Sequence, residues 1–250
     1  MSTIVKTCVD CVLPADKEEQ AKAIAERKNI NNLILPENPE DLDEAMALDV
    51  RKLWEPGQTL RVRFMDGDPA VQQKVEAVAH EWSQFANIKF VFGDDPDAEI
   101  RISFQFAGSW SYIGVDALLI PKDQPTMNYG WFTPHTSDLE YHRVVLHEFG
   151  HALGCIHEHQ NPGQGGIPWN EQAVIDFYAG PPNQWSEEQV RVNILNKYAK
   201  DETQFTAFDN LSIMLYPVPQ AHTVGDFEVP WENSQLSDTD KAFIGEMYPF

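Results

Sequence analysis

Three histidines, a glutamate and a glycine stand at spacings suited to metal chemistry within eleven consecutive residues of this chain, 147–157. His147 and His151 are four residues apart, which on a helix sets them only about 40° apart around the axis, so the two imidazoles can share one metal ion. Gly154 can adopt the positive-φ conformation that ends a helix, and the chain then returns His157 from another direction. Three protein ligands leave one position of zinc open for water. The spacing therefore predicts a catalytic Zn²⁺ site held by His147, His151 and His157.

Glu148 follows the first histidine directly. One residue along a helix is a rotation of about 100°, so this carboxylate stands beside the water position instead of binding the metal. Zinc lowers the pKa of a bound water towards neutrality and polarises a carbonyl group, and a neighbouring carboxylate takes up the proton. Glu148 is therefore predicted to be the general base of a hydrolase. The remaining histidines lack this spacing and are interpreted as structural residues: His80, His135, His142, His159 and His222.

The zinc-binding stretch needs a helix, and the sequence predicts one from about residue 138 to 153, with Ser137 and Glu140 as a capping pair. The chain before it alternates apolar and polar residues from Thr59 onward, as a half-buried strand does. Asp68 with Pro69 then opens a helix, whose apolar stripe is predicted to run from Val71 through Trp82 to Phe85. Further strands are predicted at 88–92, 100–104, 108–114 and 127–132, and further helices at 170–178, 186–198 and 237–247.

Residues 1–57 differ from the remainder, which we expect to form the catalytic domain, 58–250. This N-terminal extension contains Cys8 and Cys11, and its helical patterns begin near Asp16 and Asn38. We consider it either a pro-segment or a helical appendage packed on the catalytic domain. A cysteine thiolate bound at the open zinc position would keep the enzyme latent. Two reduced thiols, a local disulfide or a second metal site are the alternatives for this pair.

Composition limits the partners of the chain. It has 250 residues, of which 42% are hydrophobic, enough to bury a core, and a formal net charge of -21, which disfavours nucleic acid because its phosphates repel an acidic surface. No apolar run is long enough to span a membrane. No signal peptide is visible, so we expect a cytoplasmic protein or one secreted by another route. The three cysteines provide no disulfide framework, and the oligomeric state stays open.

The histidine pattern followed by Glu158, together with the segment 212–217, resembles the astacin-like branch of the metzincin zinc peptidases, and the continuation 157–162 is similar to that of microbial members. The resemblance implies that Met214 forms a hydrophobic floor beneath the metal. It also implies that Tyr216 is a movable fifth ligand or a hydrogen-bond donor to the oxyanion. In this branch the acidic residue after the third histidine often contacts a processed N-terminus.

The resemblance further implies an α+β, zincin-like fold. A twisted mixed sheet would be backed by the zinc-binding helix, and a C-terminal subdomain would carry the Met-turn. The segment 108–114 would be the edge strand that holds an extended peptide by strand addition. The expected function is that of a zinc-dependent endopeptidase acting on protein or peptide substrates. The alternatives are a zinc hydrolase of small or self substrates and a catalytically silent zinc-binding interaction module.

Overall fold

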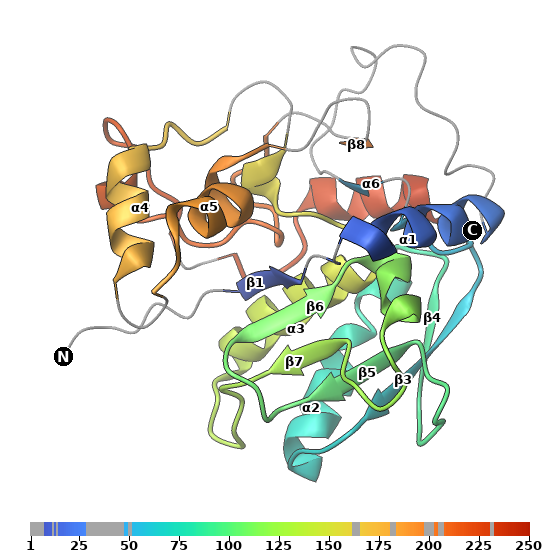
Figure 1. Cartoon of the computed structure of the whole chain (residues 1–250). Coiled ribbons are helices and arrows are strands. Elements are labelled where there is room, and N and C mark those ends of the chain that lie inside the picture. The colour runs from blue at the N-terminus through green and yellow to red at the C-terminus, as the bar shows by residue number, and fades with distance from the viewer. Residues whose placement is uncertain are drawn as a thin grey trace.

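The computed structural model of the chain (Figure 1) describes residues 8–11, 13, 15–28, 48–49, 52–161, 166–180, 184–197, 203–204, 208–230 and 233–250. The helix predicted to begin near Asn38 lies outside these residues. Of the two cysteines in the extension, only the backbone is described. Among the described residues, no helix combines the length and the apolar character needed to cross a membrane.

A five-stranded mixed sheet forms the centre of the molecule. Its strands are β3 (Thr59–Phe64), β4 (Lys89–Phe92), β5 (Ile100–Ser103), β6 (Ser109–Tyr112) and β7 (Met127–Tyr129). They are ordered β6-β7-β5-β3-β4, and all are parallel except β6, which is antiparallel to β7. At the outer edge, β1 (Cys8–Cys11) pairs in parallel with β6. A separate two-stranded sheet joins β2 (Leu48–Asp49) to β8 (Thr203–Gln204).

Helices cover the sheet and build the C-terminal part. They are α1 (Ala15–Lys28), α2 (Pro69–Ala79), α3 (Asp138–Ala152), α4 (Glu171–Ala179), α5 (Glu187–Val190) and α6 (Asp238–Met247). Shorter turns are η4 (Trp82–Gln84), η5 (Gly114–Leu119), η6 (Glu158–Gln160), η7 (Arg191–Leu195) and η8 (Gln220–His222). In Figure 1, α2 and α3 lie behind the sheet, and the C-terminal helices α4, α5 and α6 lie above it. This arrangement confirms the predicted α+β class and mixed sheet.

The helix predicted after the first strand forms as expected at its start and ends earlier than expected. Asp68 accepts a hydrogen bond from the Ala70 amide at 2.8 Å, and Pro69 occupies the first turn. The apolar stripe was expected to continue through Trp82, but α2 ends at Ala79 and Trp82 lies in η4. From there its indole Nε1 donates to the Leu146 carbonyl of α3 at 3.0 Å. The early end thus lets Trp82 tie η4 to the zinc-binding helix.

The predicted helix 186–198 is also shorter than expected. Ser186 and Gln189 form a capping box at its start, but α5 continues only as the single π-helical turn η7, which ends at Leu195. Beyond α5, the carbonyl oxygens of Asn193 and Asn196 accept hydrogen bonds from side chains of η6, at 3.2 and 3.4 Å. The contact with His159 therefore uses the Asn193 carbonyl, which an α-helix continuing to residue 198 would have bonded internally.

The residues just before the first strand of the sheet belong to the core. Trp54 is fully buried in the main hydrophobic cluster, and Lys52 forms a buried ion pair with Asp116 at 2.9 Å. The predicted domain boundary follows residue 57, three residues beyond this tryptophan. We propose that the catalytic domain begins before Lys52, because removing the segment 52–54 would leave a cavity in the core and would take a cationic partner away from a buried carboxylate.

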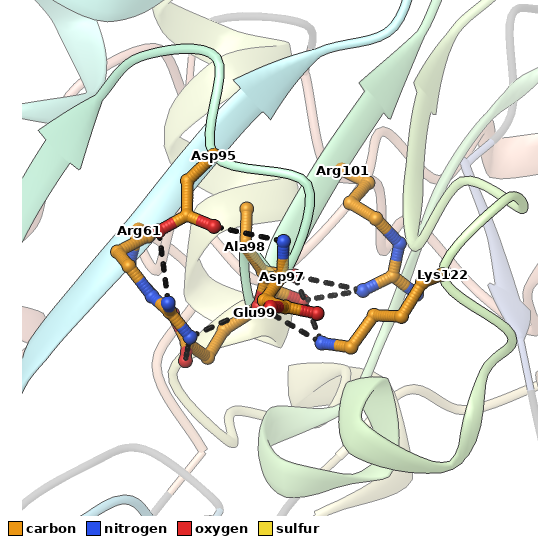
Figure 2. Close-up of polar contacts among 7 residues, drawn as sticks. All are labelled: Arg61, Asp95, Asp97, Ala98, Glu99, Arg101 and Lys122. Carbon is orange, nitrogen blue, oxygen red and sulfur yellow. Dashed lines mark hydrogen bonds and ion pairs between the residues drawn. The ribbon is translucent and has the colours of Figure 1, made fainter.

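Three cationic side chains fix the loop between β4 and β5 (Figure 2). Arg61 of β3 pairs with Asp95 at 2.9 Å and also binds Glu99. From the other side, Lys122 donates to the Asp97 carbonyl and Arg101 to the Ala98 carbonyl, each at 2.9 Å. The carboxylates of Asp95 and Glu99 are thus paired with Arg61, and these contacts together with the bound backbone carbonyls fix the loop against the sheet.

Candidate active site

The zinc-binding helix ends as its sequence predicts. Ser137 accepts the Glu140 amide at the start of α3, at 3.3 Å. At the other end Gly154 has φ of 106°, a conformation that side chains with a Cβ rarely adopt. The amide of Cys155 then bonds back to the Gly150 carbonyl at 3.0 Å. This closing turn reverses the chain and brings the segment that holds the third histidine back over α3.

Two side chains from distant parts of the chain bind the carbonyl groups at the end of α3. The Trp54 indole Nε1 donates to the Ala152 carbonyl at 2.7 Å. The Tyr248 hydroxyl donates to the Leu153 carbonyl at 2.6 Å and accepts from the Trp54 amide at 3.2 Å. Carbonyls at a helix end need such partners when they are buried. Trp54 and Tyr248, which are 194 positions apart, therefore hold the helix end from which the histidine ligands project.

The structure brings the three predicted metal ligands together. The Nε2 atom of His147 lies 3.2 Å from that of His151 and 3.1 Å from that of His157, and the remaining Nε2 pair is also 3.1 Å apart. All three side chains are buried. Nitrogen ligands of a tetrahedral zinc ion, each about 2.0 to 2.1 Å from the metal, are about 3.3 Å apart. The three atoms are thus positioned to hold zinc.

The second ring nitrogen of each histidine has an oxygen partner. His147 Nδ1 donates to the Ile213 carbonyl and His151 Nδ1 to the Cys155 carbonyl, both at 2.8 Å. His157 Nδ1 lies 3.1 Å from the Tyr216 hydroxyl. A carbonyl only accepts, so the first two imidazoles carry their proton on Nδ1 and present a lone pair on Nε2. Such partners fix both the tautomer and the orientation of a ligand ring.

Burial keeps the site in the protonation state that a metal needs. The pKa of His147 is held well below its usual value, first by burial and then by the neighbouring His151 and His157. A protonated imidazole cannot coordinate a metal, whereas the neutral form favoured here can. The buried, neutral imidazole of His147 therefore suits the uptake of a dication.

Glu148, Met214 and Tyr216 also lie within this region. Glu148 is fully buried on α3, one residue from the first histidine. Met214 is fully buried too, and it approaches α3 so closely that a Cβ atom on Gly150 would lie 2.4 Å from its Sδ atom. The Tyr216 ring centroid is 4.4 Å from that of His157. The Tyr216 ring thus lies against His157, and its hydroxyl is hydrogen-bonded to His157 Nδ1.

The two residues that follow the third histidine, Glu158 and His159, complete the buried region. Glu158 accepts hydrogen bonds from the Asn161 side chain at 3.1 Å and the Asp209 amide at 2.9 Å, and burial raises its pKa to about 8. The His159 ring stacks on that of His157 at 5.0 Å and lies 4.8 Å from that of Tyr216. His159, interpreted from the sequence as structural, thus packs against the site without joining the ligand set. Its position two residues after a ligand was the only sequence signal for this.

Solved structures of known proteins resemble this chain closely. A structure of myroilysin is 46% identical to it, covers 82% of this chain and 98% of that chain, and superposes with a TM-score of 0.78. The chain belongs to the astacin family of zinc metalloproteases. A second myroilysin structure is 45% identical, covers 80% of this chain and 86% of that one, and has a TM-score of 0.63. The astacin-like resemblance inferred from the histidine pattern is therefore confirmed.

Two more distant matches share less with this chain. The structure of high choriolytic enzyme 1, a hatching enzyme zinc-protease from Oryzias latipes, shares the fold with a TM-score of 0.51 at 16% identity, covering 79% of this chain and 94% of that one. Interstitial collagenase from Bos taurus is 29% identical in an alignment of 99 positions that covers 35% of this chain. The chain spans about a fifth of that collagenase, 21% of its length. No family model matches the chain.

As an astacin-family protein, the chain is a zinc metalloendopeptidase, and zinc is its cofactor. The expected zincin-like fold is confirmed by the same neighbours. The buried group of His147, His151 and His157 is positioned to hold the ion.

Proposed function

We propose that this astacin-like endopeptidase hydrolyses peptide bonds with Glu148 as the general base. The observation that carries the proposal is the placement of a buried carboxylate on α3 between two ligands whose Nε2 atoms converge with that of His157. Bound zinc supplies a Lewis acid and lowers the pKa of water. Glu148 takes the proton of the attacking water and later passes it to the leaving amine.

Tyr216 has two roles in this proposal. In the structure its hydroxyl is 3.1 Å from His157 Nδ1, and it serves there as the acceptor that orients this ligand. The phenol also provides a hydrogen-bond donor to the oxyanion when the side chain rotates towards the substrate. Met214, packed against Gly150, forms the apolar floor of the site. The buried surroundings strengthen each of these polar interactions, because the local dielectric is low.

An extended peptide is the substrate form that fits the sheet. β6 is the outermost of the five central strands, and its inner edge is bonded to β7. The pairing of β1 with its outer edge supports the proposal that this edge accepts an extended backbone. Main-chain hydrogen bonds would then hold the substrate with little demand on its sequence, and side-chain pockets would add specificity.

The test is Glu148→Gln, which removes the base and retains the size of the side chain. We expect the variant to bind one zinc ion per chain and to lose about 10²- to 10⁴-fold in kcat on a peptide substrate. Glu140→Gln is a matched control, because Glu140 lies on the same helix and binds Arg143 and Trp131 instead. Hydrolysis by the Glu148 variant at the rate of the Glu140 variant would place the base elsewhere.

A further inference from the structure

We infer that Asp240 is a positioning residue for the zinc ligand His147, acting through the turn that carries Met214. Asp240 lies in the first turn of α6, 93 positions after His147 in the chain, and its side chain is fully buried. It contacts no ligand directly. Its carboxylate instead binds the Ser212 hydroxyl and the Ile213 amide, and the Ile213 carbonyl holds the His147 ring. This inference rests on the proposed function, since it takes His147 as a ligand of the metal.

Both oxygen atoms of the Asp240 carboxylate accept hydrogen bonds. Oδ1 accepts from the Ser212 hydroxyl at 2.8 Å, while Oδ2 accepts from the Ile213 amide at 2.8 Å and the Ser237 amide at 2.9 Å. The Ser237 bond is the reciprocal half of the capping box of α6. A helix cap needs only that one contact. The other two extend beyond α6 and bind a separate segment of the chain.

These two contacts order the segment that surrounds the ligands. The Ser212 hydroxyl, held by Asp240, also accepts from the Met214 amide at 3.1 Å. The Ile213 amide and carbonyl belong to neighbouring peptide units, and the carbonyl accepts from His147 Nδ1 at 2.8 Å. The Met214 carbonyl accepts the Glu158 amide, next to the third ligand, at 3.1 Å. One carboxylate therefore fixes a short turn that contacts both ends of the zinc-binding stretch.

The burial of this network makes the carboxylate difficult to replace. Truncation to alanine would leave the Ile213 amide and the Ser212 hydroxyl without their acceptor in a site closed to solvent, where a polar group that loses its partner keeps its full desolvation penalty. The turn would shift to recover hydrogen bonds, and the Ile213 carbonyl would move with it. Outer partners of ligand histidines are worth about 10- to 100-fold in metal affinity. The expected effect is therefore weaker zinc binding.

Asparagine provides the conservative replacement. Its carbonyl oxygen can accept both amides, and its Nδ2 can donate to the Ser212 oxygen, which has two lone pairs and already accepts from Met214. Asp240→Asn should thus preserve the turn, whereas Asp240→Ala should not. Asp66→Ala is the matched control: Asp66 also accepts one serine hydroxyl, from Ser103 at 2.6 Å, and one backbone amide, from Phe104 at 2.8 Å, but it lies in the loop after β3 and binds the end of β5.

The experiment measures zinc affinity of the full-length chain by competition with a chelator, below the unfolding temperature of every variant. We expect Asp240→Ala to weaken zinc binding by about 10- to 100-fold, Asp240→Asn to restore most of it, and Asp66→Ala to lower only thermal stability. The visible spectrum of the cobalt-loaded protein should change in Asp240→Ala alone, because ligand geometry has changed. Zinc affinity equal to wild type in Asp240→Ala would overturn the inference.

If Asp240→Ala does not fold, Ser212→Ala provides a second test of the inference. This variant removes the hydroxyl that links Asp240 to Met214 and should weaken zinc binding, though less than truncation of the carboxylate. Wild-type affinity in Ser212→Ala would then overturn the inference. A wild-type chain that bound no zinc would instead refute the proposed function, so the two failures are distinguishable.

Discussion

At the residue scale, the orientation of each ligand histidine depends on a hydrogen bond between its Nδ1 atom and an oxygen atom of the protein. For His147 and His151 these atoms are backbone carbonyls, which cannot be removed by substitution, whereas for His157 the partner is the Tyr216 hydroxyl. The third ligand is therefore the one whose orientation depends on a side chain. Orienting His157 is therefore a second role of Tyr216, in addition to the hydrogen bond to the oxyanion that the family resemblance implies.

Tyr216→Phe tests that dependence. We expect kcat to fall by about 10- to 1000-fold, because the phenol is lost as a donor to the oxyanion. Zinc affinity should fall as well, by about 10-fold, because His157 Nδ1 loses its acceptor. Chelator competition and steady-state kinetics separate the two effects. If neither quantity changes, Tyr216 is a core residue only.

The sequence predicted the ligands and not their partners. His147, Glu148 and His151 lie within one helical turn, and Gly154 marks where the helix stops, so local spacing alone specifies their geometry. The Ile213 carbonyl that holds His147 is 66 residues away. Every residue has a backbone carbonyl, so no residue type reveals which one will be used. Only the tertiary fold selects it.

At the element scale, the contact between α3 and the Met214 turn depends on the absence of a side chain at Gly150. Alanine normally stabilises a helix interior by about 0.5–1 kcal/mol relative to glycine. A Cβ atom here would lie 2.4 Å from Met214 Sδ and 3.3 Å from Trp82 Cζ2, too close for both to stay in place. We therefore expect Gly150→Ala to lower the free energy of unfolding by about 1–2 kcal/mol, because overpacking outweighs helix propensity.

Denaturant unfolding of Gly150→Ala, with Gly93→Ala as control, measures this effect. A Cβ atom on Gly93 meets nothing within 4 Å, so that substitution should be close to neutral. A stabilised Gly150 variant would show that Met214 is free to move aside, and would argue against a fixed floor beneath the metal.

β1 pairs with the edge of β6 that we propose as the substrate-binding edge. β1 runs parallel to β6 and takes up its outer backbone groups. We propose that the extension keeps the enzyme latent by covering this edge. Deletion of residues 1–28 should then raise the rate on an unrelated peptide, and the segment that contains Trp54 must be retained because it belongs to the core.

Changing both Cys8 and Cys11 to Ser separates two forms of latency. If a thiolate blocks the metal, the double variant should be as active as the deletion. If only the strand blocks the edge, the double variant should stay latent while the deletion is active. Equal activity of all three proteins would show that the extension is structural.

Local patterns predicted most elements, and long-range contacts explain the differences. β3, α2 and α3 begin where alternation and capping residues predict. The predicted helix 186–198 ends at Leu195, where carbonyls of this segment bind η6 instead. Pairing partners in the sheet, and the attachment of Trp54 to the end of α3, lie too far apart in sequence for any periodic pattern to indicate them.

At the scale of the whole molecule, the zinc site lies where segments from the entire catalytic domain meet. The helix with the first two ligands packs on the sheet and is held at its end by Trp54 and Tyr248. The C-terminal part contributes the Ile213 carbonyl through the turn fixed by Asp240. Zinc bound only by the folded state should therefore stabilise the whole domain, and its removal should abolish activity and lower the unfolding temperature together.

The most direct test of the central claim is cleavage of a mixed peptide library by the zinc-loaded protein, using the residue 1–28 deletion variant alongside the full chain. We predict internal cuts in the peptides, loss of all cuts after chelation, and recovery when one equivalent of zinc is returned. Cuts that persist after the metal is removed would contradict the account, and so would the absence of cuts by both proteins when each holds stoichiometric zinc.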